Sequence, residues 1–207
     1  MTLTQAIHDL EILKDDHARI GKETMEKVLY PLDFLAFAVL NRSLCLTSGF
    51  VTLIGANNLT AAAPLVRLQL DNALRFFAST LVDEPHAFAM KVLGGTRIDK
   101  LKDRSGQRLR DAYLVEVLSA HHPWITLVYK ETSGFVHLSE KHIFNSMKVT
   151  DKEEHRILMK ISDRDEFAPE SAYLEAVDVF TKATKVALDL ASAWARQRNK
   201  PTPDHRS

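Results

Sequence analysis

The stretch that decides the fold is TAAAPLVRLQLDNALRFFASTLV, residues 60–82. Apolar side chains occur on nearly every side of this segment when it is wound at 3.6 residues per turn. A helix without a wide polar face is typical of the middle of a helical bundle. The segment therefore predicts a central helix around which the rest of the chain packs.

The segments on either side also have helical patterns. Residues 4–29 are amphipathic, residues 31–56 are the most apolar stretch, and residues 169–197 form the expected last helix. Pro31 and Pro169 suit the first turns of these helices, because the N–H that proline lacks has no partner there. We expect a mostly α-helical bundle of about six helices, in which the long first and last helices pack together and offer a homodimer face.

One region changes from a helical period to a period of two. Apolar and polar residues alternate on both sides of the short charged segment DKEE, residues 151–154. This pattern predicts one small β-hairpin at about residues 142–162, before the C-terminal helix. The alternating apolar residues are Ile143, Met147, Val149, Ile157, Met159 and Ile161.

The length and the net charge of the chain limit the class of protein to which it can belong. The 207 residues suit one domain, expected over residues 1–198, with a disordered polar tail at 199–207. Lys and Arg together number 27, as do Asp and Glu, so the formal net charge is zero. A nucleic-acid binder that works through its overall field is therefore disfavoured, although a local basic patch is not.

The cysteine content and the apolar stretch bear on the compartment. Cys45 is the single cysteine, so one chain can form neither a disulfide nor a cysteine-based metal site. Asp33, Asn41 and Arg42 interrupt the apolar stretch, which indicates a buried helix and no membrane association. We expect a cytoplasmic protein without a structural metal or a cofactor.

The most unusual feature of the central helix is a pair of charges on an apolar face. Arg67 and Asp71 are four residues apart, so their side chains can meet. Two interpretations are open: an ion pair that fixes the register of the helix, or charges positioned for a ligand. Asn41, Cys45, Ser48 and Thr52 form a stripe on the preceding helix, which could pack tightly or line a polar cleft opposite the pair.

A third group of polar residues occurs in YKETSGFVHLS, residues 129–139. If residues 124–136 continue as one helix, Tyr129, Ser133 and His137 lie on one face, and a hydroxyl beside an imidazole can form a nucleophile–base pair. A hydrogen-bonded core histidine is the alternative interpretation of His137.

The connection TRIDKLKDRSGQRLR, residues 96–110, is locally basic, with six Lys or Arg and two Asp. Such a run is usually a solvated surface loop. The functional alternative is a contact for phosphate groups of RNA or of a nucleotide. The absence of aromatic residues from this segment disfavours base stacking there.

Several of these segments resemble known families. PLVRLQLDNALRFF resembles the Arg-x-x-x-Glu/Asp helix of a group of uncharacterised bacterial all-helical domain families, SGFVH is similar to their Ser-x-x-x-His segment, and GGTRIDKL is similar to their connection between the two. The resemblance covers about residues 37–138 in patches. It implies an all-α domain that brings Arg67, Asp71, Ser133 and His137 together.

A looser resemblance is to HEPN-type helical domains, which are often ribonucleases of defence and toxin systems. Their motif places an Arg shortly before a His, whereas Lys130 and Glu131 precede His137 here. Arg67 could supply the cation from another helix.

Two functions from different classes follow from these patterns. The first is a binding or regulatory module whose polar cleft around Arg67, Asp71 and His137 takes a small anionic ligand, with Asn41 and Tyr129 as further ligand contacts. The alternative is a metal-independent ribonuclease with Arg67, Ser133 and His137 as catalytic residues and RNA as substrate.

Overall fold

The computed structural model describes residues 1–26, 28–132, 134, 140–151 and 155–198. This part of the chain contains eight α-helices and a single antiparallel hairpin of two strands before the last helix, which confirms the predicted fold class. The tail predicted at 199–207 lies outside the described residues. The elements are α1 (Leu3–Met25), α2 (Pro31–Gly55), α3 (Leu59–Phe77), η1 (Ala78–Thr80), α4 (Pro85–Leu93), η2 (Ile98–Lys100), α5 (Asp111–Ser119), α6 (Trp124–Glu131), α8 (Glu140–Asn145), β1 (Met147–Asp151), β2 (Arg156–Met159) and α9 (Glu170–Arg198).

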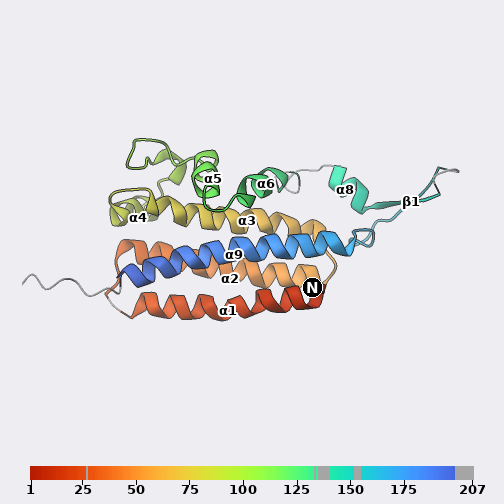
Figure 1. Cartoon of the computed structure of the whole chain (residues 1–207), viewed down its shortest axis with the longest axis horizontal. Coiled ribbons are helices and arrows are strands. Elements are labelled where there is room, and N and C mark those ends of the chain that lie inside the picture. The colour runs from red at the N-terminus through yellow and green to blue at the C-terminus, as the bar shows by residue number, and fades with distance from the viewer. Residues whose placement is uncertain (27, 133, 135–139, 152–154, 199–207) are drawn as a thin grey trace, which may run out of the picture.

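Four long helices, α1, α2, α3 and α9, lie alongside one another and form the body of the molecule (Figure 1). Helix α3 packs against α2 and α9 and also against α5 and α6, so it occupies the central position that its composition predicted. Helices α1 and α9 pack together, as expected, while the homodimer face stays a prediction. Helix α8 and the hairpin extend beyond one end of the bundle (Figure 1).

Local sequence signals set the start of these helices. Pro31 opens α2, and the carboxylate of Asp33 accepts a hydrogen bond from the backbone N–H of Tyr30 at 2.7 Å, which caps the helix. Asn57 has a positive φ of 57°, and the side chain of Asn58 accepts from the backbone N–H of Ala61 at 2.9 Å. The two asparagines therefore end one helix and cap the next.

The hairpin is shorter than predicted. Strand β1 pairs with β2 in a register that places Met147 opposite Met159 and Val149 opposite Ile157. The predicted start at 142 is wrong, because residues 140–145 form helix α8, and the backbone N–H of Ser146 still bonds to the carbonyl of Ile143 at 3.1 Å. The extended alternation therefore begins only at Met147.

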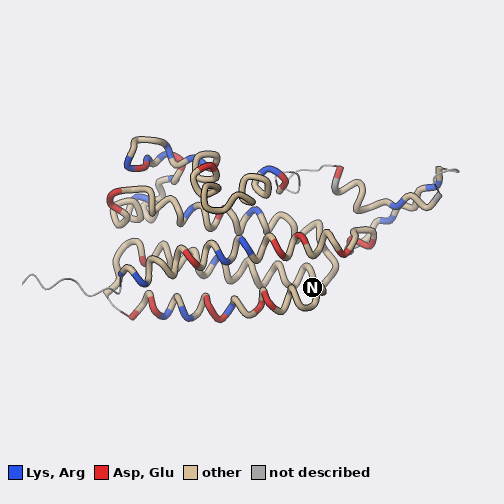
Figure 2. The backbone as a smooth tube through the Cα atoms, in the orientation of Figure 1, with Lys and Arg blue, Asp and Glu red and all other residues tan. Residues whose placement is uncertain are grey.

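Helix α2 is the most apolar element and carries few charges along its length (Figure 2). By length and composition it is the one helix of the described residues that could cross a membrane, with a mean hydropathy of 1.5 in its most apolar window. Of its most apolar stretch of 18 residues, 39% is buried inside the molecule, where α2 packs against α1, α3 and α9.

A chain of hydrogen bonds between polar side chains crosses the centre of the bundle. Gln69 of α3 donates to the hydroxyls of Ser43 at 2.5 Å and Thr184 at 2.9 Å. His17 of α1 contacts the Ser43 hydroxyl through Nε2 at 2.8 Å and the carbonyl of Leu13 through Nδ1 at 2.7 Å. A neutral His17 satisfies both contacts, since Nδ1–H donates to the carbonyl and Nε2 accepts from Ser43. The chain joins α1, α2, α3 and α9.

A buried ion pair fastens the end of α9 to the start of α2. The side chains of Asp33 and Arg198 are only 1% and 5% exposed, and Nε of Arg198 lies 3.0 Å from the carboxylate. Trp194 Nε1 donates to the other carboxylate oxygen at 2.8 Å, and Arg198 also donates to the carbonyls of Thr24 and Val28. These partners compensate both buried charges, and they place the C-terminal ends of α1 and α9 at the same end of the bundle.

Candidate functional site

The basic connection between α4 and α5 is a closed turn rather than a loose loop. After η2, the backbone pairs at Lys102 and Arg108, and Gly106 adopts a φ of 86° at the tip. Ile98 and Leu109 are buried and anchor the two sides of the turn to the bundle. The basic connection is therefore an ordered scaffold.

Asp103 fixes this turn to α5. Its carboxylate accepts hydrogen bonds from the backbone N–H groups of Ser105 at 2.9 Å and Gln107 at 2.8 Å, and from the hydroxyl of Tyr113 at 2.5 Å. The bond from Tyr113, followed by those from Ser105 and Gln107, lowers the pKa of Asp103 to about 2. The carboxylate therefore stays ionised and keeps the turn closed over the whole physiological pH range.

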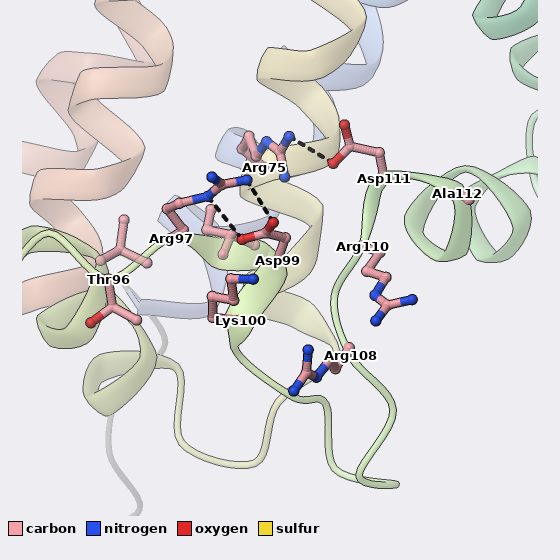
Figure 3. Close-up of a pocket in the computed structure, with 11 residues that line it drawn as sticks. Arg75, Thr96, Arg97, Asp99, Lys100, Arg108, Arg110, Asp111 and Ala112 are labelled. Atoms are coloured by element: carbon pink, nitrogen blue, oxygen red, sulfur yellow. Dashed lines mark hydrogen bonds and ion pairs between the residues drawn. The ribbon is translucent and has the colours of Figure 1, made fainter.

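A pocket with a volume of about 650 Å³ lies between η2 and the start of α5 (Figure 3). We call it the basic pocket, because five cationic side chains and only two carboxylates line it. Its lining residues are Arg75, Val92, Thr96, Arg97, Ile98, Asp99, Lys100, Arg108, Arg110, Asp111 and Ala112.

Both carboxylates of the basic pocket are already paired. Arg75 bridges Asp111 at 2.7 Å and Asp71 at 3.0 Å, and Arg97 contacts Asp99 at 2.7 Å. Figure 3 shows the pairs of Arg75 with Asp111 and of Arg97 with Asp99 on one side of the pocket. Their charges largely cancel, so they form a rigid wall and contribute little net attraction for an anion.

Three further cations of the pocket have no such partner. Within the described parts of the chain, Lys100, Arg108 and Arg110 take part in no ion pair and no side-chain hydrogen bond, and all three are exposed. Figure 3 shows the guanidinium groups of Arg108 and Arg110 away from Arg75, and the amine of Lys100 beside Asp99. Lys100 interacts electrostatically with Asp99, but that carboxylate is already paired with Arg97, so this half of the pocket carries a net positive charge.

The start of α5 adds to the same half of the pocket. Arg110 is the N-cap residue of this nine-residue helix, and no side chain caps the first turn. Arg110, Asp111 and Ala112 line the pocket, so the first turn of α5 borders the space beside the three cations. Unbonded N–H groups and the helix dipole at such an end favour a negatively charged group.

The structure places the predicted site residues in two separate groups. The guanidinium of Arg67 donates to the backbone carbonyl of Tyr129 at 2.7 Å and lies over its ring, 3.3 Å from the centroid. The predicted pair of Arg67 with Asp71 is wrong, because the carboxylate of Asp71 contacts Arg75 at 3.0 Å and Arg42 at 3.4 Å. Arg67 and Tyr129 are together, and Asp71 belongs to the ion pairs behind the basic pocket.

The remaining predicted residues do not complete a cleft in the part of the chain that can be described. Asn41 is exposed on α2, as are Cys45, Ser48 and Thr52 of its stripe. The hydroxyls of α2 that face the core are instead those of Ser43 and Thr47. Ser133 and His137 lie outside the described residues, so their catalytic roles stay predictions.

The predicted sites do not include Arg75, Lys100, Arg108, Arg110 or Asp111. One signal for them was present in the sequence, namely the six cations of residues 96–110. What the sequence did not reveal is that the acidic residues of this region are each bonded to another group. Four of the six cations then have no ion pair among the described residues, and three of these line the basic pocket. The pairing of Asp111 with Arg75 joins residues 36 positions apart and has no local signature.

Two further findings concern the kind of site. No group of three or more His, Cys, Asp or Glu suited to a metal ion occurs among the residues that the structure describes. In comparisons with family models, with curated proteins and with solved structures, nothing matches the chain.

Proposed function

We propose that the protein is a binding module that takes a small phosphate-bearing anion in the basic pocket. The observation that carries the proposal is the group of three unpaired cations, Lys100, Arg108 and Arg110, in one open pocket. Like charges repel, so a folded protein gains nothing from gathering them unless an anion joins them. A ligand with negative charge supplies the missing partner.

The rigidity of the site supports the same proposal. Asp103 fixes the turn that carries Arg108, and Arg75 joins α3 to the first residue of α5 through Asp111. Side chains that start from a fixed backbone lose less freedom on binding than those of a loose loop. The usual interpretation of such a basic run is a solvated surface loop. A solvated loop would not need these bonds.

The chemistry of the lining favours binding over catalysis. The residues that line the pocket include no histidine, cysteine, serine or tyrosine. Its two carboxylates, Asp99 and Asp111, are engaged with arginines. A general base that works near neutral pH is therefore missing from the lining, whereas groups that attract an anion are abundant.

The test is a comparison of two double variants by titration calorimetry with inorganic pyrophosphate at low ionic strength. We expect Arg108→Gln/Arg110→Gln to weaken binding by at least about tenfold, which is about 1.4 kcal/mol. The matched control Arg164→Gln/Lys185→Gln removes two exposed cations that do not line the pocket, and it should bind like the wild type. Equal weakening in both variants would show that only the overall charge matters.

One observation keeps the ribonuclease as a second candidate. Arg67 and Tyr129, predicted to share a site, are in contact, and α6 ends at Glu131, just before the segment with Ser133 and His137. The test is cleavage of single-stranded RNA by the wild type and by His137→Ala, with circular dichroism as the check of folding. Equal cleavage by the two proteins, or none by either, would exclude this candidate.

A further inference from the structure

We infer that the ligand of the basic pocket is a compact oligophosphate, that is, two or three directly linked phosphate groups recognised without a nucleobase. This inference rests on the proposed function and narrows it to one chemical class. The charge, the size and the lining of the pocket each support it.

The charge of the pocket exceeds what a single phosphate brings. Lys100, Arg108 and Arg110 contribute three unpaired positive charges, and the start of α5 adds about half of one. A terminal phosphate group carries about −1.5 to −2 at neutral pH. One group therefore leaves the site positive, whereas two or three linked groups come close to balancing it.

The size of the pocket points the same way. Its volume of about 650 Å³ falls in the range of small-molecule sites, about 300–1,000 Å³. The three unpaired cations approach this space from both sides of the turn, Lys100 at the end of η2 and Arg108 and Arg110 on the returning segment. A ligand must extend between them to contact all three.

A turn of the returning segment separates two of these cations. Residue 108 takes part in a backbone pair of antiparallel type, and Arg110 has the extended angles φ −77° and ψ 153°. The N–H of Arg110 also donates to the carbonyl of Arg108 at 2.8 Å, so the chain makes a tight turn at Leu109. Leu109 between them is fully buried, while Arg108 and Arg110 are exposed. The turn therefore presents two exposed guanidinium groups to the pocket on either side of one buried anchor (Figure 3).

The lining offers nothing that recognises a nucleobase. No phenylalanine, tyrosine, tryptophan or histidine lines the pocket, and its apolar contacts are limited to Val92, Ile98 and Ala112. Proteins that bind single-stranded RNA or bases stack them on aromatic side chains. The pocket therefore recognises phosphate groups, and an attached base or sugar would remain in solvent.

The experiment is a set of calorimetric titrations of the full chain in magnesium-free buffer at fixed ionic strength. The probes are orthophosphate, pyrophosphate, tripolyphosphate, ATP, citrate and a short single-stranded RNA. We expect tripolyphosphate and pyrophosphate to bind at least tenfold more tightly than orthophosphate and citrate. ATP should bind no more tightly than tripolyphosphate, because the base adds no contact. Lys100→Gln and Arg108→Gln/Arg110→Gln should each reduce the preference for tripolyphosphate over orthophosphate.

The outcomes separate this inference from the proposed function. If orthophosphate or citrate binds as tightly as tripolyphosphate, and the pocket variants still weaken it, the pocket binds anions but the oligophosphate class is wrong. If RNA or ATP binds at least tenfold more tightly than tripolyphosphate, recognition extends beyond phosphate and the inference is again wrong. If no probe binds, or if the pocket variants bind like the wild type, the proposed function fails as well.

Discussion

The centre of the bundle and the basic pocket use polar side chains in opposite ways. In the centre, Gln69, Ser43 and His17 bond to one another, and Asp33 and Arg198 neutralise each other. In the basic pocket, Lys100, Arg108 and Arg110 exceed in number the two carboxylates, which already form ion pairs with Arg75 and Arg97. Burial explains the difference, because an unpaired polar group is costly in the core and nearly free of cost at the surface.

The contrast separates stability from function. Among the described residues, every buried side-chain polar atom of the core except Oε1 of Gln69 has a partner. Bonding within the fold therefore explains most of their arrangement. The arrangement of Lys100, Arg108 and Arg110 has no such explanation within the fold. Substitutions in the core should therefore change stability, and substitutions in the pocket should change binding alone.

The largest effect is expected from the buried ion pair. Asp33→Asn keeps the size of the side chain but leaves Arg198 without a counter-charge in a buried position, which costs about 3–5 kcal/mol. Chemical unfolding at neutral pH measures this loss. The control is Asp178→Asn on α9, the helix that carries Arg198. This substitution breaks an exposed pair with Lys182 and should change stability little. Equal effects of the two substitutions would mean that the end of α9 is not fastened as described.

The next effect concerns the chain of hydrogen bonds in the core. Ser43→Ala removes one of the two acceptors of Gln69 and the partner of His17 Nε2, and the buried groups left behind should cost about 1–3 kcal/mol. Ser48→Ala on the exposed side of α2 is the matched control and should be nearly neutral. A smaller loss from Ser43→Ala than from Ser48→Ala would contradict the assignment of the inward face of α2.

His17, a member of this series of hydrogen bonds, makes stability depend on pH. Burial is the main cause that lowers the pKa of His17 below its ordinary value of 6.5. The unfolded chain then binds a proton more readily than the folded one, so stability is complete above pH 6.5 and falls as the pH drops below it. Urea unfolding between pH 5 and 8 measures the slope. In His17→Gln the slope below pH 6.5 should be reduced, and an unchanged slope would assign it to other groups.

The smallest effect on stability is expected in the basic pocket. Arg108→Gln/Arg110→Gln should leave the unfolding midpoint unchanged or slightly raised, because it removes repulsion between exposed cations and breaks no bond within the protein. A loss of more than about 1 kcal/mol, outside the usual range for surface substitutions, would show that the two arginines are structural.

The sequence predicted the fold better than the site, and particular residues show why. The central position of α3 follows from its apolar composition, which is a property of the segment itself. The partner of Asp71 cannot be deduced from the segment alone, because Arg67 and Arg75 both lie four residues from it. Contacts distant in the sequence decided between them: the carbonyl of Tyr129 engages Arg67, and Asp111 engages Arg75.

The same reason explains the stripe of α2. Hydroxyl groups occur on two of its sides, and apolar residues surround both, so the pattern does not reveal which side faces the core. The packing of α1, α3 and α9 places Ser43 and Thr47 inward and Ser48 and Thr52 outward. The basic run was visible as composition, but its closed turn depends on the pairing of Lys102 with Arg108 and on the bond from Tyr113 to Asp103.

The most direct test of the central claim is the shift of the thermal unfolding midpoint on adding tripolyphosphate. A ligand that binds only the folded state raises the midpoint with its concentration. We predict the same rise for the wild type and for Arg164→Gln/Lys185→Gln, and little or no rise for Arg108→Gln/Arg110→Gln. An equal rise in all three proteins, or a rise in none, would contradict the claim that the unpaired cations of the basic pocket bind an anion.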